Sequence, residues 1–250
     1  MAKMLQDKVA VITGGNSGIG LATAKRIARE GAKVVITGRR QAELDAATRQ
    51  IDGDVLAVRG DVSDLRDLDG LFAAVKERHG RVDVLFANAG LGEFAPLGTI
   101  TEEHFDKTFN INVKGLLFTV QKALPLMPDG ASIVLNASIV SIKGMEAFSV
   151  YSASKAAVRS FARTWTMDLK ARKIRVNAVS PGPIVTPGID GLAKSPQEAD
   201  AIRASLVAGV PMGRMGEADE IAKAVVFLAS DQSSFVTGIE LFVDGGIAQV

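Results

Sequence analysis

Short runs of β-branched and other apolar residues alternate along this chain with longer stretches whose apolar positions recur at helical spacing. Several of the short runs have few polar interruptions, as expected of strands that are covered on both faces. The predicted strands are residues 9–13, 33–37, 55–59, 82–87, 131–137, 174–180 and 239–243. The predicted helices are residues 19–30, 41–50, 65–79, 101–126, 151–171 and 218–228. Because strands alternate with helices, we expect right-handed βαβ units and an α/β fold with a parallel sheet.

One segment interrupts this rhythm. Residues 183–210 follow the end of a predicted strand and open with the sequence Pro-Ile-Val-Thr-Pro-Gly. Irregular insertions of this length are often binding loops or lids, so we expect a substrate loop or lid here. The sequence contains no internal repeat, low-complexity tract or linker, and we therefore expect residues 1–250 to form a single domain.

The composition is that of an ordinary globular protein, since apolar residues make up 47% of the 250 residues and charged residues 23%. A formal net charge of +1 gives no global attraction to nucleic acid or to an anionic membrane, and we expect neither as a partner. The sequence has no apolar run of the roughly 18–20 residues that a membrane span needs. Its N-terminus carries no apolar signal segment, so we expect a cytoplasmic location.

The chain has no cysteine, which excludes disulfides, thiolate catalysis and cysteine-ligated zinc. Its two histidines, His79 and His104, lie far apart in polar stretches, and we expect both at the surface. A histidine-centred metal site or catalytic triad is therefore not expected.

A glycine-rich turn follows the first predicted strand. Residues 13–20 read Thr-Gly-Gly-Asn-Ser-Gly-Ile-Gly, with the spacing Gly-x-x-x-Gly-x-Gly instead of the commoner Gly-x-Gly-x-x-Gly. Glycines permit a tight turn, and the N-terminus of the following helix offers free N–H groups to a pyrophosphate. The place of the turn in the first βα unit favours dinucleotide binding over an ordinary strand–helix connection. The expected contacts are Gly14, Asn16, Ser17, Gly18, Ile19 and Gly20.

The end of the second predicted strand bears on the choice of cofactor. An acidic residue about 20 positions after the glycines typically holds the ribose 2′-hydroxyl of NAD, whereas arginine accommodates the 2′-phosphate of NADP. Here Gly38 is followed by Arg39 and Arg40, and no carboxylate occurs before Glu43. Two guanidiniums can bind a phosphate with charge-assisted hydrogen bonds. The sequence therefore favours NADP(H), with a solvated basic turn as the alternative.

Two further motifs follow predicted strands. Asp61 and Val62 follow the third strand, where an acidic side chain can accept from the adenine amino group. Asn88, Ala89 and Gly90 follow the fourth, where small residues let the backbone approach the nucleotide. Either motif alone is compatible with an ordinary turn. Both fall at the carboxyl ends of strands, which is where open α/β sheets bind ligands.

Tyr151 and Lys155 lie four residues apart at the start of a predicted helix, and Tyr151 is the only tyrosine of the chain. This spacing places the phenol and the ammonium on one helix face. A free phenol titrates near pH 10, too high for efficient proton exchange at neutral pH. A cation about 4 Å away contributes about 4 kcal/mol, so we expect Lys155 to lower the tyrosine pKa. A solvated helix face is the alternative.

Together, and in this order along nearly the whole chain, these features resemble the short-chain dehydrogenase/reductase family. The resemblance implies a single-domain Rossmann-type doubly wound parallel sheet of about seven strands flanked by helices. Ala87 is a small departure, because many members have a second asparagine before the Asn-Ala-Gly motif. The resemblance rests on residues 13–20, Asp61, Asn88, Ala89, Gly90, Asn112, Ser138, Tyr151, Lys155, Pro181 and Gly182.

The resemblance also implies catalytic roles. Tyr151 is expected to be the general acid in reduction and the general base in oxidation, and Lys155 to bind the nicotinamide ribose. Ser138 is expected to hydrogen-bond the substrate oxygen, and Asn112 to anchor a water that links Lys155 to solvent. Ser138 is preferred to the nearby Ser141 because its separation from Tyr151 is the family's usual one. This chemistry requires no metal, and we expect none. Further cofactor contacts are expected at Ile111, Pro181, Gly182, Ile184 and Thr186.

The residues expected to line the substrate pocket are mostly apolar, although core packing is the alternative for each. None offers the guanidinium expected for a carboxylate substrate, which favours a neutral ketone or aldehyde and the corresponding secondary alcohol. The chain also resembles bacterial NADPH-dependent alcohol dehydrogenases that act on bulky ketones, in scaffold segments such as residues 164–166 and 241–246. The expected pocket residues are Leu91, Gly92, Ile139, Val140, Ile142, Phe148, Leu192 and Leu206.

Two other functions stay open. A 3-oxoacyl-carrier-protein reductase has the same fold and catalytic residues, and Arg172 and Lys173 could dock its acidic carrier. Residues 127–130, however, lack the basic cluster often found there. A non-catalytic NADP(H)-binding regulator is the other alternative, although it would not need the complete catalytic set. Because the family usually forms tetramers through its long helices and C-terminal strand region, we expect a homotetramer.

Overall fold

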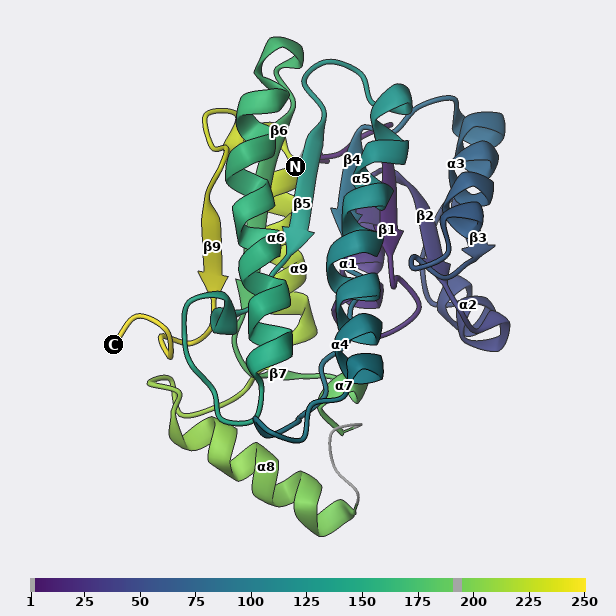
Figure 1. The fold of residues 1–250 in the computed structure, drawn as a ribbon. Helices are drawn as coiled ribbons and strands as arrows, with labels where there is room; N and C mark the ends of the chain where they lie inside the picture. Colours follow the sequence, from purple (N-terminus) through teal and green to yellow (C-terminus); the bar gives the residue numbers. More distant parts are fainter. Residues whose placement is uncertain (1–2, 191–194) are drawn as a thin grey trace.

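Seven parallel strands form the central sheet of the computed structural model, which describes residues 3–190 and 195–250 (Figure 1). The strand order is β3-β2-β1-β4-β5-β6-β9, and it reverses between β1 and β4. The register pairs Ile12 with Ile36 on one side and with Phe86 on the other. The strands are β1 (Val9–Thr13), β2 (Lys33–Gly38), β3 (Val55–Arg59), β4 (Val84–Ala87), β5 (Ser132–Asn136), β6 (Arg175–Pro181) and β9 (Glu240–Val243). The predicted α/β fold with a parallel sheet is confirmed.

Helices cover both faces of this sheet. One hydrophobic core contains Val11 and Val35 and is closed by α3 (Leu65–His79), α5 (Leu116–Ala123) and α6 (Ser149–Asp168). The other contains the alternate positions Ala10 and Ile12 and is closed by α1 (Gly18–Arg29), α2 (Gln41–Thr48) and α9 (Ala218–Ala229). Because successive strand residues point to opposite faces, both sets are buried and the strands read as nearly continuous apolar runs. In the described part of the chain no helix is long and apolar enough to cross a membrane.

The helix predicted over residues 101–126 is not a regular α-helix. It consists of α4 (Glu102–Phe109), a π-helical turn η1 (Asn110–Gly115), α5 and a short 3-10 turn η2 (Leu124–Leu126). A π turn adds a residue to the helical repeat, and such turns are frequent at functional sites. Here it contains Asn112, one of the expected catalytic residues.

The segment 183–210 is more regular than we expected. Ile184–Val185 forms the short strand β7, which pairs in parallel with β8 (Gly216–Glu217). A short helix α7 (Pro187–Asp190) follows, and then α8 (Pro196–Ala208). The Ser195 hydroxyl caps α8 by accepting from the Glu198 N–H, so a serine followed by proline was a helix-start signal in the sequence. The helix lies across the end of the sheet to which the strand arrows point (Figure 1).

Candidate active site

A cavity of about 460 Å³ opens at the carboxyl ends of the strands. Its wall receives residues from the segments that follow β1 to β6, on both sides of the reversal in strand order. Open α/β sheets bind ligands at this position because the connections on the two sides leave in opposite directions. Every residue expected to contact the cofactor lines this cavity.

The glycine turn is shaped for close approach by a ligand. Gly14 and Gly18 have positive φ angles of 65° and 50°, which residues with a Cβ rarely adopt. A Cβ on Gly20 would lie 2.1 Å from the Gly14 carbonyl oxygen, so only glycine fits there. Helix α1 begins after Ser17, whose side chain makes no capping bond, and its first turn contains no acidic residue. Its N–H groups and positive dipole end therefore remain available to an anion.

Replacing Gly20 by alanine tests this fit. We expect the variant to lose NADPH affinity and about 1–3 kcal/mol of stability, because the added methyl group forces the glycine turn apart. Gly70 of α3 provides the matched control, since a Cβ there would meet nothing within 4 Å. Gly70→Ala should leave NADPH binding unchanged and raise stability by about 0.5–1 kcal/mol. Equal NADPH affinity in Gly20→Ala and the parent, measured by fluorescence titration, would contradict this account of the turn.

Both arginines after β2 line the cavity, but each also has a carboxylate partner. Nη1 of Arg39 lies 3.8 Å from Oδ2 of Asp61. Arg40 donates to Glu43, which also accepts from Nδ2 of Asn16 at 2.7 Å. The hydrogen bond from Arg40 holds the pKa of Glu43 below its ordinary value. Glu43 thus lies closer to the predicted phosphate site than the sequence suggested, and its charge opposes that of the arginines.

The Asn88-Ala89-Gly90 segment is bound to the glycine turn. The Thr13 hydroxyl accepts from the backbone N–H groups of Asn88 and Ala89, each at 3.0 Å. The Asn88 amide donates to the Thr13 carbonyl at 2.9 Å and accepts from Asn136 Nδ2 at 2.9 Å. The Asp61 side chain is also held by hydrogen bonds within the protein, because its Oδ1 accepts from both the N–H and the hydroxyl of Ser63. These contacts fix the cavity wall from within the protein.

Tyr151, Lys155 and Ser138 meet at one end of the cavity. Tyr151 and Lys155 project from the first turns of α6, and Ser138 begins the 3-10 turn η3 (Ile139–Ser141) after β5. The Ser138 hydroxyl lies within reach of the Tyr151 phenol and lowers the pKa of the phenol by hydrogen bonding. Nζ of Lys155 lies 5.5 Å from the centre of the Tyr151 ring and donates to the Asn136 carbonyl at 2.7 Å. Asn136 was missed by sequence reasoning, although it ends a strand at the expected ligand edge.

Burial governs the titration of this pair. It raises the pKa of Tyr151 to about 12, against the lowering effect of the hydrogen bond from Ser138. It also lowers the pKa of Lys155 to about 8. The pKa of Tyr151 is therefore not lowered overall in the protein alone, contrary to the prediction from its spacing to Lys155, because the cost of burying the phenolate dominates. Tyr151 consequently keeps its proton at neutral pH, as a proton donor must.

The burial of Lys155 should make the free energy of unfolding depend on pH. Its pKa is about 8 in the fold against an ordinary 10.5, so the charged form is destabilised in the folded state. The penalty is fully present below pH 8, where both states are charged, and disappears as the unfolded chain loses its proton near pH 10.5. The stability advantage of Lys155→Met over the parent should therefore fall by about 3 kcal/mol over this interval. Urea unfolding of both proteins between pH 8 and 10.5 measures this change. A difference in stability that does not vary with pH would contradict the shifted pKa of Lys155.

Asn112 lies behind the cavity wall and is only 1% exposed. Its Nδ2 donates to the Leu91 carbonyl at 2.9 Å and to the Ser154 hydroxyl at 3.0 Å, and its Oδ1 accepts from the Leu91 N–H at 3.0 Å. A Cβ on Gly90 would lie 3.2 Å from Asn112 Oδ1 and 3.4 Å from Lys155 Nζ. The amide thus holds the chain that carries Leu91 close beside the lysine.

The apolar end of the cavity agrees with the sequence expectation in most positions. The prediction for Ile142 is wrong. This residue is 50% exposed and lies outside the cavity wall, at the point where the chain leaves η3. Leu192 lies outside the described residues. The residues that do line the cavity are Leu91, Gly92, Ile139, Val140, Phe148 and Leu206.

The apolar wall residues that sequence reasoning missed include Phe94, Met145 and Ile202. The Phe94 ring lies 4.6 Å from that of Phe148, which lies 4.4 Å from that of Tyr151. Phe94 was detectable only as an aromatic residue in the loop after β4. Ile202 is one helical turn from Leu206, and that spacing would have revealed it had α8 been recognised.

The two histidines lie away from the cavity. His79 and His104 are partly buried and not simple surface residues, and neither lines the cavity. Burial lowers the pKa of His79, and His104 lies 3.7 Å from Glu93. Among residues 3–190 and 195–250, the structure has no group of three or more histidine, aspartate or glutamate side chains placed to hold a metal ion.

Comparison with known proteins decides the family. The family model described as "Enoyl-(Acyl carrier protein) reductase" matches residues 14–248. Oxidoreductase asL5 of Sarocladium schorii is 46% identical, over 98% of both chains. The NADP-dependent (R)-specific alcohol dehydrogenase of Lentilactobacillus kefiri is 39% identical, again over 98% of both. The chain belongs to the short-chain dehydrogenase/reductase family.

This member of the short-chain dehydrogenase/reductase family is accordingly an oxidoreductase, and the family uses nicotinamide cofactors. The crystal structure of levodione reductase superposes on it with a TM-score of 0.94 at 35% identity, covering 98% of this chain and 99% of that one. The agreement confirms the predicted Rossmann-type doubly wound sheet in a single domain.

Proposed function

We propose that this protein is an NADP(H)-dependent ketoreductase, which interconverts neutral, bulky ketones or aldehydes and the corresponding alcohols. The observation that carries the proposal is the convergence of the Ser138 hydroxyl, the Tyr151 phenol and the Lys155 ammonium at the apolar end of a cavity whose other end is a glycine turn. Segment 183–210 serves as the substrate lid in this proposal, since Leu206 of α8 lines the cavity. The reducing conditions of the cytoplasm suit a chain without cysteine.

The residues present fit a nicotinamide dinucleotide. The close-packed glycine turn and the uncapped N-terminus of α1 suit the pyrophosphate. Arg39 and Arg40 are placed at the cavity edge after β2, where a 2′-phosphate would lie. Lys155 suits the ribose hydroxyls beside Tyr151. When bound, the cofactor supplies the hydride that adds to the carbonyl carbon.

The protein's own residues then manage the proton and the charge. Ser138 and Tyr151 bind the carbonyl oxygen from one side, and Tyr151 donates its proton to that oxygen as charge develops on it. Its raised pKa keeps that proton in place before reaction. The positive charge of Lys155 favours the phenolate left behind, and its own pKa of about 8 lets it pass a proton on. In alcohol oxidation the same residues act in reverse.

The substrate class follows from the cavity wall. Phe94, Phe148 and Ile139 present apolar surface next to Tyr151, and Asn112 holds Leu91 in the same wall. Such a wall favours a ketone without charge on either substituent. Initial rates with NADPH across small ketones, bulky ketones and acyl thioesters test this choice. We expect the highest kcat/KM for a bulky uncharged ketone, and a strong preference for acyl thioesters would contradict it.

A 3-oxoacyl-carrier-protein reductase is the alternative, because a protein of that name from Thermotoga maritima is 39% identical to this chain over 97% of its length. Docking of an acidic carrier through Arg172 does not suit this chain. Arg172 donates to the Leu124 and Met127 carbonyls and pairs with Asp129 at 3.2 Å. It also precedes β6, at the edge of the sheet opposite the cavity (Figure 1). A non-catalytic regulator would bind NADPH without turning over any ketone of the panel.

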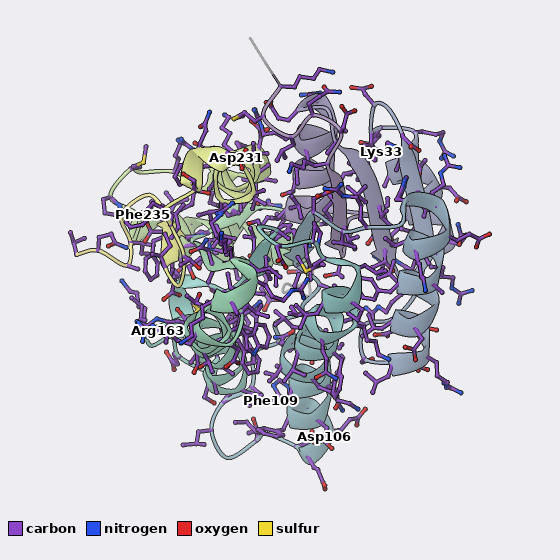
Figure 2. All side chains as sticks on the ribbon, turned by 90° about the horizontal axis from the view of Figure 1, so that it is seen from above. Lys33, Asp106, Phe109, Arg163, Asp231 and Phe235 are labelled. Carbon is purple, nitrogen blue, oxygen red and sulfur yellow. The ribbon has the colours of Figure 1, made fainter. Side chains whose placement is uncertain are left out.

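We further propose that the protein forms a homotetramer. The side chains of Phe235, Met167 and Ile239 are exposed near the C-terminal strand and the far end of α6. Figure 2 places Phe235 and Arg163 at the periphery of the molecule. Exposed apolar side chains that gather on one side suit a subunit interface. Light scattering in solution should give the mass of four chains, and the mass of a single chain would contradict the proposal.

A further inference from the structure

A buried carboxylate lies next to the catalytic residues and takes no part in the reaction described above. The side chain of Glu240, on β9, is only 7% exposed. Its Oε2 lies 2.5 Å from Nε of Arg159 on α6. Its Oε1 accepts from the Ser180 hydroxyl of β6 at 2.6 Å and from the Ser141 hydroxyl. One carboxylate therefore connects β9, β6, α6 and the turn η3.

Such a group is not explained by stability alone. A buried ion pair often contributes little net stability, because removing both charges from water costs several kcal/mol. An apolar residue on this strand would have packed against β6 without that cost. The Glu240 carboxylate is therefore better explained by the segments of the protein that it holds together.

Two of the three charged or polar links of Glu240 lead to the catalytic set. Ser141 ends the η3 turn that Ser138 begins, and the Ser141 N–H donates to the Ser138 carbonyl at 2.9 Å. Arg159 follows Lys155 by four residues on α6 and Tyr151 by eight, so the three share one helix face. Glu240 thus contacts the turn that carries Ser138 through one oxygen and the helix that carries Tyr151 through the other.

We infer that Glu240 is a positioning residue that fixes the Ser138 hydroxyl against the Tyr151 phenol, with Ser141 and Arg159 as its two attachments. The inference rests on the proposed function, because it gives that Ser138–Tyr151 contact its catalytic purpose. Beyond η3 the chain is exposed at Ile142, Lys143 and Gly144, and there the Lys143 ammonium donates to the Ile247 carbonyl. A misplacement of about 1 Å at a reacting group can cost about a hundredfold in rate.

Ser141→Ala tests the inference, because it detaches the turn and leaves Ser138 itself intact. We expect kcat to fall by about tenfold to a hundredfold, while the Michaelis constant for NADPH changes by no more than about twofold. The pH midpoint of alcohol oxidation should move upward, because Tyr151 loses the hydrogen bond that lowers its pKa. Ser141→Thr keeps the hydroxyl and should restore most of kcat.

Ser180→Ala is the matched control. Ser180 donates to the same oxygen of Glu240 but does not belong to the Ser138 turn. We expect it to affect thermal stability, with kcat within about twofold of the parent. Glu240→Gln combined with Ser141→Ala should lose less activity than the product of the single losses, since both variants break one connection. Equal losses of kcat in Ser141→Ala and Ser180→Ala would indicate a purely structural network and overturn the inference.

A second readout does not depend on turnover. Because the chain has one tyrosine, isotope-labelled tyrosine gives a single phenol carbon resonance in NMR spectra. In Ser141→Ala this resonance should move toward its position in Ser138→Ala. If it moves in a protein that reduces no ketone, the positioning is correct and the proposed function fails. If the parent is active and Ser141→Ala changes neither the resonance nor kcat, the positioning role is wrong.

Discussion

Tyr151→Phe is expected to lower kcat for ketone reduction by about a thousandfold, the upper part of the range for loss of a positioned general acid. The phenylalanine ring keeps the contact with Phe148, at 4.4 Å between ring centres, so the fold and the cavity wall should be preserved. Only the hydroxyl is lost, and with it the proton that the reaction delivers to the carbonyl oxygen. NADPH affinity should remain within about threefold of the parent, since ribose binding is assigned to Lys155.

The comparison with Ser138→Ala makes this prediction specific. Ser138 stabilises the developing charge but transfers no proton, so its loss should be smaller, about tenfold to a hundredfold in kcat. Stopped-flow rates of NADPH oxidation and fluorescence titration of NADPH measure the two quantities separately. If Tyr151→Phe keeps an activity within tenfold of the parent, another group must be the acid. Loss of the general acid would leave far less activity than that.

Arg39→Ala combined with Arg40→Ala should raise the Michaelis constant for NADPH by about a hundredfold and leave that for NADH within about threefold. Hydrogen bonds to a charged group contribute about 1.5–3 kcal/mol each, and the two arginines are the cations placed after β2 at the cavity edge. NADH lacks the 2′-phosphate, so it should not register their loss. Equal effects on both cofactors would remove the basis for NADP(H) preference.

Neutralising Glu43 should have the opposite effect on NADPH binding. It pairs with Arg40 and accepts from Asn16, and its charge would repel a phosphate at that position. Glu43→Gln should therefore lower the Michaelis constant for NADPH by about threefold to tenfold, by releasing Arg40 and removing the repulsion. An increase instead would show that Glu43 orients Arg40 for the cofactor. The double arginine variant should abolish the gain from Glu43→Gln.

The sheet was predictable because both of its faces are buried. Residues 9–13 are apolar or threonine throughout, and each is buried in the fold, so the run could not be mistaken for an exposed connection. The helices of both layers followed from their 3.6-residue periodicity. The π turn at Asn110–Gly115 was not predictable, because one added residue in a helix of mixed polarity leaves too small a trace in the pattern.

Some residues of the candidate site could be predicted from the sequence and others could not. Glycines and arginines at strand ends were informative because local geometry dictates where a ligand meets a parallel sheet. Lys155 shows the limit, since its spacing from Tyr151 was correct while burial reversed the expected tyrosine pKa. Ile142, Phe94 and Glu240 depended on how distant segments pack. In particular, Glu240 is a single carboxylate at the start of the otherwise apolar edge strand β9, a position where the sequence predicts an exposed side chain.

Transfer of deuterium from NADPH labelled at the nicotinamide C4 to a bulky uncharged ketone tests the central claim most directly. The account predicts that mass spectrometry finds the label on the carbinol carbon of the alcohol formed by the parent protein, and none in product from Tyr151→Phe over the same time. Tight binding of NADPH without labelled alcohol from any ketone of the panel would contradict it.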